Sequence, residues 1–315
     1  MTNILIEKLP YQSDSTTLFD KIADEPWSAF LDSNQPRGTQ GRFDIMVARP
    51  KVCITTQNNK TKIQTWSESF TVTDDPFVVL KEQLSRSRIS NSKFPFIGGA
   101  LGFFSYDLGR YIEKVPSIST DDLELPDMAI GIYLWAIIVD HKKKKSVLVG
   151  DGSDTKTRRD WNDLKKIFTT KYSSTEPPEF NIKSHVISNM TQEYYSNAFA
   201  KIKNYISGGD CYQVNLSQRF SVVFEGNPWS AYQVLRKINP SPFSAYMNYT
   251  DFQILSNSPE QFLSVKENFV QTKPIKGTRP RSKDKNKDRL LLKELINSKK
   301  DQAENLMIVD LLRND

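Results

Sequence analysis

The strongest constraint on the fold is an apolar run near the middle of the chain. Residues 128–139 read MAIGIYLWAIIV and carry no charge. Such a run must be buried, and its β-branched and aromatic residues favour a strand. It is well short of the about 20 residues that a membrane-spanning helix needs. The run therefore predicts a buried strand over 128–140, a turn over the lysines 142–145 and a returning strand over 146–149.

The rest of the first half is also rich in strand patterns. Strands are predicted over residues 42–48, 51–56, 62–72 and 96–106. The last of these is glycine-rich, which in a buried strand indicates close backbone approach or a bulge. Helices are predicted over residues 18–31 with an interruption at Pro26, over 77–84 and over 161–168.

A polar stretch with a double proline, residues 170–181, is typical of a linker. It predicts a domain over residues 1–170, a linker over 171–188 and a second domain over 189–315. In the second half a helix capped by Thr191 should run to Ile206 and stop at residues 207–210. Further strands are predicted over 212–223 and 252–255, and further helices over 228–238, 290–296 and 300–312.

Composition excludes several classes of function. The 315 residues are 38% hydrophobic and 25% charged, as expected of a soluble globular protein with a core. The net charge of +6 is mild, and neither basic patch, 142–145 or 279–289, is interleaved with aromatic residues, which disfavours a nucleic-acid surface. Cys53 and Cys211 lack metal-ligand spacing and imply no disulfide framework. With no secretory signal, a cytoplasmic location is predicted.

The turn around Lys276 is the best candidate for chemistry. Prolines and a glycine constrain it, and it follows an apolar strand pattern. Two acidic residues accompany it: Glu260 follows a strand, and Glu304 lies on a predicted helix. Taken singly, each has an ordinary explanation. These are a surface turn for Lys276, a helix-start acid for Glu260 and an ion pair with Lys300 for Glu304.

Together and in order, the motifs of this chain resemble those of the chorismate-utilising enzymes of the anthranilate synthase component I type. The motifs that carry the resemblance are EPWSAFLDS (25–33), GRFDIMVARP (41–50), GGALGFFSYDLGR (98–110), LPDMAIGIYLWAIIVDH (125–141), GDCYQVNLSQRF (209–220), NPSPFSAYM (239–247), SNSPEQF (256–262), PIKGTRPR (274–281) and SKKDQAENLMIVDLLRND (298–315). The resemblance implies an α+β chorismate-binding fold, with two antiparallel-rich sheets packed together and helices on the outside.

Position 276 discriminates within that family. Anthranilate synthases look like PIAGT here, whereas aminodeoxychorismate synthases have the lysine found in this chain. The resemblance therefore implies an enzyme of the transaminase class. It would convert chorismate and ammonia to 4-amino-4-deoxychorismate for p-aminobenzoate and folate synthesis. Its ammonia would come from a glutamine amidotransferase partner, component II of that synthase.

The resemblance also implies roles for single residues. Lys276 would be the nucleophile through a covalent intermediate, Glu260 the general acid and Glu304 a ligand of Mg²⁺. Gly277 and Thr278 would contact the substrate. Because a free lysine amine is protonated at neutral pH, the site would have to lower the pKa of Lys276.

We hypothesise that two neighbouring cations, Lys273 and Arg279, lower the pKa of Lys276. The Glu260 carboxyl would in turn need a raised pKa to hold its proton, and a poorly solvated pocket could supply that shift.

A second set of residues corresponds to a buried tryptophan site in relatives. The resemblance implies tryptophan binding by Ser33, Gln40, Gly41, Arg42, Phe43, Pro242, Phe243 and Ser244.

Two alternatives stay open from the sequence. One is anthranilate synthase component I. The other is a catalytically incomplete chain that keeps only tryptophan or partner binding, because the sequence ends at Asp315 inside a predicted helix, before the family's C-terminal third. For that reason little synthase activity is expected of this chain alone. Neither a nucleic acid nor a membrane is expected as a partner.

Overall fold

The computed structural model describes residues 4–34, 41–86, 93–170 and 179–314. It divides into two compact units. The larger joins residues 1–172 to residues 235–315, and the smaller is residues 173–234. The predicted domains, 1–170 and 189–315, divide the chain differently and stay a prediction.

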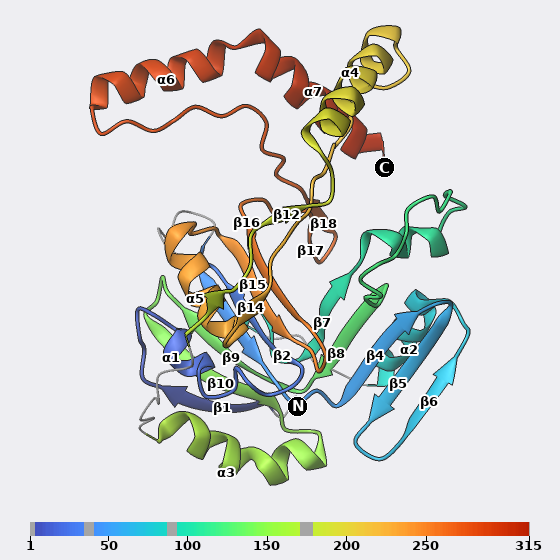
Figure 1. Cartoon of the computed structure of the whole chain (residues 1–315). Coiled ribbons are helices and arrows are strands. Elements are labelled where there is room, and N and C mark those ends of the chain that lie inside the picture. The colour runs from blue at the N-terminus through green and yellow to red at the C-terminus, as the bar shows by residue number, and fades with distance from the viewer. Residues whose placement is uncertain (1–3, 35–40, 87–92, 171–178, 315) are drawn as a thin grey trace. The chain divides into compact units, whose positions relative to one another are not determined.

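An antiparallel sheet of seven strands forms one part of the larger unit, in the order β1-β10-β9-β3-β2-β15-β16 (Figure 1). Its strands are β1 (Ile4–Leu9), β2 (Ser28–Asp32), β3 (Phe43–Val47), β9 (Trp135–Asp140), β10 (Lys145–Asp151), β15 (Phe243–Asn248) and β16 (Gln253–Ser258). Strand β2 lies in the interior of the sheet and pairs with β3 on one side and with β15 on the other.

A second antiparallel sheet has five strands in the order β6-β5-β4-β8-β7. Its strands are β4 (Val52–Gln57), β5 (Lys60–Thr65), β6 (Ser69–Val72), β7 (Gly99–Phe104) and β8 (Met128–Tyr133). The predicted strand over 62–72 is thus two strands joined by a turn.

The apolar run links the two sheets. It was predicted as one strand, but Leu134 divides it into β8 of the five-stranded sheet and β9 of the seven-stranded sheet. Every residue of β8 is buried, and so is Leu134. One apolar cluster contains Leu101 and Tyr133 from one sheet and Val47 and Ala136 from the other. The two sheets therefore share a core, which confirms the predicted α+β architecture.

Helices lie on the outside of the sheets in the larger unit (Figure 1). These are α1 (Thr16–Phe19), α2 (Pro76–Arg86) and α3 (Thr155–Thr169), with a 3-10 helix at Tyr106–Tyr111. Val79 of α2 packs in a second apolar cluster with Val52, Ile54 and Ile63 of the five-stranded sheet. The N-terminus of α3 is capped by Asp154, whose carboxylate accepts a hydrogen bond from Thr157 N at 2.9 Å.

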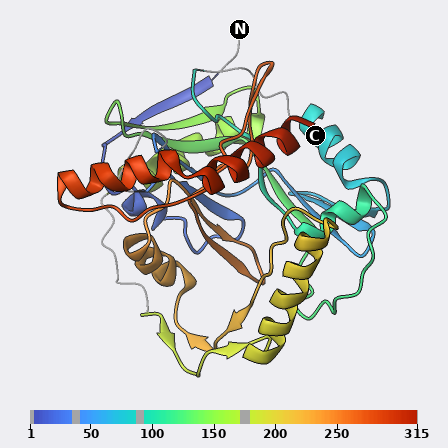
Figure 2. The same ribbon diagram turned by 90° about the horizontal axis from the view of Figure 1, so that it is seen from above.

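The last part of the chain consists of a hairpin and two helices. They are β17 (Ser264–Lys266), β18 (Phe269–Gln271), α6 (Lys285–Asn297) and α7 (Lys299–Asn314). Figure 2 shows α6 and α7 following one another along the chain's end. Both helices are longer than predicted.

The smaller unit holds α4 (Gln192–Gly208) and four short strands, with α5 (Pro228–Ile238) continuing from it into the larger unit. The strands are β11 (Asn181–Ile182), β12 (Ile187–Ser188), β13 (Phe220–Ser221) and β14 (Phe224–Glu225). As predicted, the Thr191 hydroxyl caps α4 by accepting from Tyr194 N at 3.1 Å, and α4 ends at Gly209, where φ is 81°.

Two predicted elements are wrong. The helix over residues 18–31 is only the short α1, followed by turns and by strand β2, because pairing on both edges of β2 outweighs helical spacing. The strand over 212–223 is reduced to β13, at 220–221. Within the described residues, no helix is both long and apolar enough to cross a bilayer.

Gly102 of β7 is a position that only glycine fits. A Cβ atom added there would lie 2.0 Å from the carbonyl oxygen of Ala129 on β8. By contrast, a Cβ added at Gly109 would meet no heavy atom within 4 Å. Alanine substitutions at these two glycines can therefore be compared. The comparison separates the effect of close packing at Gly102 from the effect that alanine has in place of any glycine.

We predict that Gly102→Ala lowers the free energy of unfolding by about 1–3 kcal/mol, because the β7–β8 backbones must move apart. Gly109→Ala should change it by less than about 1 kcal/mol, in the stabilising direction if at all. Urea unfolding followed by circular dichroism measures both. Equal stability of the two variants would show that β7 and β8 do not approach as closely as described.

Candidate active site

The candidate acid lies just past the end of β16. Ser258 closes that strand, and its hydroxyl accepts from Glu260 N at 3.3 Å and donates to Glu260 O at 3.0 Å. This local turn fixes the backbone of Glu260. The Glu260 side chain is half-buried, and its Oε1 accepts a hydrogen bond from Ile275 N at 3.0 Å. The predicted acid therefore contacts the residue directly before the predicted nucleophile, Lys276.

The β17–β18 hairpin explains why residues so far apart in sequence meet. In its register Ser264 pairs with Gln271. Continuing the same register four residues outward from each strand brings Glu260 opposite Ile275. The Glu260 hydrogen bond thus extends the pairing of the hairpin.

Lys276 itself is half-buried, and within the described residues its ammonium makes no ion pair or hydrogen bond. Gly277 has a φ of +70°, which favours glycine. A Cβ there would lie 2.7 Å from Cγ of Asp301 on α7. The Lys276–Gly277 turn therefore rests against α7. Thr278, also predicted to meet the substrate, is exposed to solvent.

Arg279 is neutralised by carboxylates of both terminal helices. Its Nε lies 2.7 Å from Glu294 of α6, and its guanidinium lies 3.2 Å from Asp301 of α7. Two carboxylates thus balance this charge, which argues against the hypothesis that Arg279 supplies the positive field at Lys276. Lys273, the other cation in that hypothesis, is exposed, where solvent screens its charge.

Glu304 lies on α7 one turn after Asp301. Residues three apart share a helix face, so both carboxylates lie on the side of α7 that meets the lysine turn. Glu304 is half-buried, and the ion pair with Lys300 that its spacing permits is not formed among the described residues. Asp301 Oδ2 is buried and accepts no hydrogen bond in the described part of the chain, although Arg279 lies within ion-pair distance.

The Glu304 and Asp301 carboxylates could supply only part of the ligand set of Mg²⁺. Mg²⁺ takes oxygen ligands and is commonly held by one or two carboxylates with water and substrate oxygens completing its shell. Within the described ranges, no three acidic, histidine or cysteine side chains cluster in a way that could hold a metal. Glu304 and Asp301 could therefore anchor the ion but not enclose it.

The residues of the predicted tryptophan site gather where β2 ends and where β3 and β15 begin. Ser244 pairs with Asp32, the neighbour of Ser33, and a Cβ at Gly41 would lie 2.6 Å from Ser33 O. Arg42 lies 4.4 Å from the ring of Phe43. The structure thus brings Ser33 together with Gly41 and Ser244. Pro242 and Phe243 adjoin Ser244 and are half-buried, and Gln40 lies outside the described residues.

A buried carboxylate that sequence reasoning missed holds Ser33 in place. Asp44 Oδ1 accepts from Ser33 N at 2.9 Å and from its hydroxyl at 2.7 Å. Asp44 Oδ2 accepts from the Ser15 hydroxyl and lies 2.7 Å from His141 Nε2. Burial alone would raise the pKa of Asp44, but His141 and the two serine hydroxyls hold it below its ordinary value.

A buried ion pair, between Arg236 and Asp32, lies beside this carboxylate. Arg236 donates to Asp32 from Nε at 2.7 Å and from Nη2 at 3.2 Å, and reaches Asp14 at 3.0 Å. Burial raises the pKa of Asp32, and the nearby Asp44 adds to this, although Arg236 opposes both. Asn34, two residues after Asp32, adds a further contact: its side-chain amide donates to Arg236 O at 2.8 Å. The candidate tryptophan site is therefore built on a fixed polar base.

Sequence signals for the missed residues were weak. Asp44 is a charged residue inside the otherwise apolar strand FDIMV, which is a usable sign of a buried partner. Asp301 and Arg236 lie on helices among other charged residues, and nothing in their spacing separates them from solvated side chains.

Comparison with known proteins places these residues in context. The family model for chorismate binding enzyme matches residues 28–315. Aminodeoxychorismate synthase component 1 of Escherichia coli (strain K12) is 43% identical over 300 residues, covering 94% of this chain and 64% of that protein. Anthranilate synthase component 1 of Acetivibrio thermocellus is 31% identical over 333 residues, covering 99% of this chain and 67% of that protein.

A solved structure agrees with the fold. The crystal structure of anthranilate synthase component I from Streptococcus pneumoniae TIGR4 superposes with a TM-score of 0.70 at 28% identity. The match covers 88% of this chain and 62% of that one. The chain thus spans about two thirds of the length of the relatives it matches. On the family match, the two-sheet fold and the shared motifs, this chain belongs to the chorismate binding enzyme family.

Proposed function

We propose that the protein acts as an aminodeoxychorismate synthase, making 4-amino-4-deoxychorismate from chorismate and ammonia. The observation that carries the proposal is the hydrogen bond from Ile275 N to Glu260, which puts a carboxyl group beside the turn of Lys276. The name of the Escherichia coli relative supports it, because that relative is more similar to this chain than the anthranilate synthase is.

In this proposal the reaction proceeds in two balanced steps. The Lys276 amine forms a bond to C2 of chorismate while the bond from C4 to its hydroxyl breaks. Glu260 donates the proton with which that hydroxyl leaves as water. Ammonia then forms a bond to C4, and the bond between C2 and the lysine nitrogen breaks, which regenerates the Lys276 amine. The new C4 ammonium group releases a proton, which restores the Glu260 carboxyl. Nucleophilic catalysis of this kind replaces one difficult displacement with two easier ones.

Bound Mg²⁺ would supply a positive charge for a carboxylate of chorismate. Glu304 would hold the ion, and Asp301, one turn earlier on α7, would assist. Because the Lys276–Gly277 turn rests against Asp301, the chain would then present the nucleophile and the metal carboxylates on adjoining surfaces.

The source of ammonia in this proposal is a glutamine amidotransferase partner. The relatives are named component 1, which supports the existence of a second component. Anthranilate synthesis is the alternative reaction, and Lys276 argues against it, since that residue is the feature by which the chain differs from PIAGT.

We also propose that tryptophan binds where β2 ends and where β3 and β15 begin. The observation in favour is the convergence of Ser33, Gly41 and Ser244 over the buried Asp44 and Arg236. A buried, hydrogen-bonded base of this kind can hold hydroxyl and backbone groups in a fixed geometry for a small ligand.

Glu260 has both a structural and a proposed chemical role, and two substitutions separate them. Glu260→Gln keeps an oxygen that can accept from Ile275 N but cannot supply the proton. Glu260→Ala removes both. If Glu260 is the acid, both variants should lose about 10²–10⁴-fold in turnover of chorismate with ammonia and Mg²⁺.

Formation of 4-amino-4-deoxychorismate, followed by chromatography, measures this loss. Lys273→Ala is the control, because Lys273 is exposed beside the same turn. Near-normal turnover in Glu260→Gln with loss only in Glu260→Ala would assign Glu260 a purely structural role.

Tryptophan binding tests the second proposal. Asp44→Asn should weaken tryptophan binding about tenfold, because the charged acceptor that fixes Ser33 is lost. Isothermal titration calorimetry measures this affinity, and Lys81→Met on α2 is a control with a charge change far from the cluster in sequence. Failure of the unaltered protein to bind tryptophan would contradict the proposal.

A further inference from the structure

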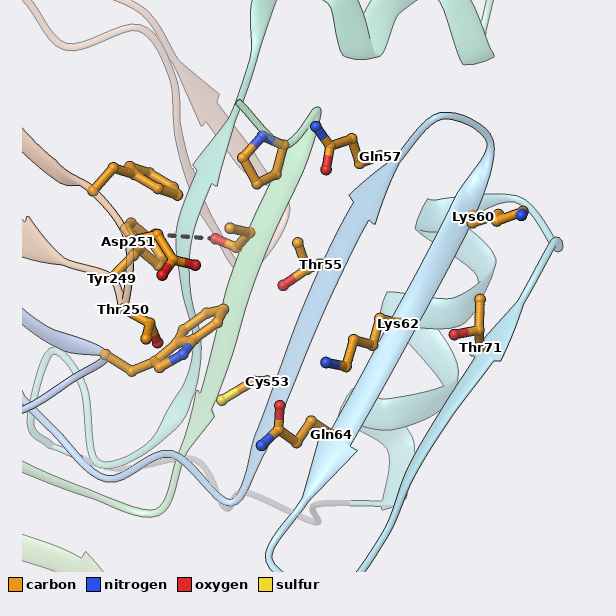
Figure 3. Close-up of a pocket in the computed structure, with 14 residues that line it drawn as sticks. Cys53, Thr55, Gln57, Lys60, Lys62, Gln64, Thr71, Tyr249, Thr250 and Asp251 are labelled. Carbon is orange, nitrogen blue, oxygen red and sulfur yellow. Dashed lines mark hydrogen bonds between the residues drawn. The ribbon is translucent and has the colours of Figure 1, made fainter. Parts of the chain in front are cut away.

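A cavity of about 380 Å³ lies in the larger unit over the face of the five-stranded sheet that turns away from α2 (Figure 3). Neither the synthase chemistry nor the tryptophan site uses any of its residues. Its volume lies within the range of about 300–1,000 Å³ that is usual for small-molecule sites.

Alternate residues of β4 and β5, with Thr71 of β6, form the floor. The side chains in between, such as Ile54 and Ile63, are buried in the core with α2, so the floor residues point the other way. The floor is polar, and its members are Cys53, Thr55, Gln57, Lys60, Lys62, Gln64 and Thr71. An exposed face of an antiparallel sheet is commonly polar, so the floor alone would indicate only a solvated surface.

Lys62 occupies the middle of this floor. It pairs with Thr55 across to β4 and with Thr71 across to β6, which places a hydroxyl on each side of the lysine. In Figure 3 the Lys62 side chain points over β4. In the described ranges Lys62 has no carboxylate partner and no hydrogen bond. Lys60, also on the floor, has none in these ranges either, so the floor offers two positive charges among neutral side chains.

The wall opposite is aromatic, and its rings contact one another. The Trp27 and Tyr249 rings lie 4.9 Å apart edge to face, and Tyr249 stacks on Phe252 at 4.8 Å. The Tyr249 hydroxyl is held by Ala129 O at 3.1 Å. Aromatic rings on one side of a cavity provide a surface for a flat, apolar group.

Trp27 adopts a backbone conformation that a bulky residue rarely takes. Its φ is 63°, in the left-handed region, so the surroundings must hold this conformation. Two hydrogen bonds hold it: Trp27 N donates to Asn248 O at 2.6 Å, and Trp27 O accepts from the Tyr133 hydroxyl at 2.7 Å. Strain of this kind, on a residue that lines a cavity, is evidence that the side chain is placed for binding.

We propose that this cavity binds a small aromatic carboxylate. The Lys62 ammonium would pair with the carboxylate, Thr55 and Thr71 would donate to its oxygens, and the ring would lie against Trp27 and Tyr249. The charged residues that line the cavity are Lys60, Lys62 and Asp251, and their net charge of +1 matches a single negative charge. Asp251 at the rim, an exposed acid, disfavours a more highly charged anion such as a phosphate.

Benzoate and benzamide are the probes, because they share a shape and differ in charge. The protein has five tryptophans, and the indole N–H signal of Trp27 in a proton–nitrogen NMR spectrum is identified by its loss in Trp27→Phe. Benzoate should shift that signal saturably, and benzamide should bind about tenfold more weakly, as expected for loss of a charged hydrogen bond.

Lys62→Met should remove the preference for benzoate, and Lys81→Met, with the same charge change on α2, should keep it. Thr55→Val should weaken benzoate binding as well, which guards against an effect of Lys62→Met on folding. The proposal is overturned by an unmoved Trp27 signal, by equal affinity for both probes, or by a Lys62→Met variant that binds as Lys81→Met does.

Discussion

The larger unit depends on the burial of the apolar residues 128–139. Because the run is too apolar to face water and too long for one strand in this unit, it divides at Leu134 between two sheets. Tyr133 and Ala136, on either side of that division, join one core cluster. The seven-stranded sheet that the run helps to form then provides the strand ends at which the candidate tryptophan-binding residues gather.

The candidate active site depends on a hairpin rather than on the core. The register of β17 and β18, extended outward, places Glu260 against the residue before Lys276. The lysine turn is supported from α7 by Asp301, which also lies within ion-pair distance of Arg279. The proposed chemistry would thereby lie on partly exposed segments, whereas the candidate tryptophan site rests on the buried side chains of Asp44, His141 and Asp32. The two sites should differ accordingly in rigidity.

Much of the fold could be predicted from the sequence, because strand alternation and helix caps are local signals. The strands near residues 42–57 and the cap at Thr191 are examples. The helix predicted over 18–31 failed because the partners of β2 lie far away in sequence. Glu260 and Lys276 could be singled out by motif, but their contact could not, since it follows from hairpin register. The roles of Asp44 and Asp301, and the cavity around Lys62, depend on tertiary packing. The sequence therefore indicates them only weakly.

The central claim is that Lys276 is the nucleophile, and mass spectrometry of the protein with chorismate and Mg²⁺, without ammonia, tests it most directly. The account predicts a covalent adduct of chorismate less one water on the peptide that contains Lys276. It should be absent in Lys276→Ala and retained in Lys273→Ala. Absence of any adduct without ammonia, together with product formation on adding ammonia that is undiminished in Lys276→Ala, would contradict the account.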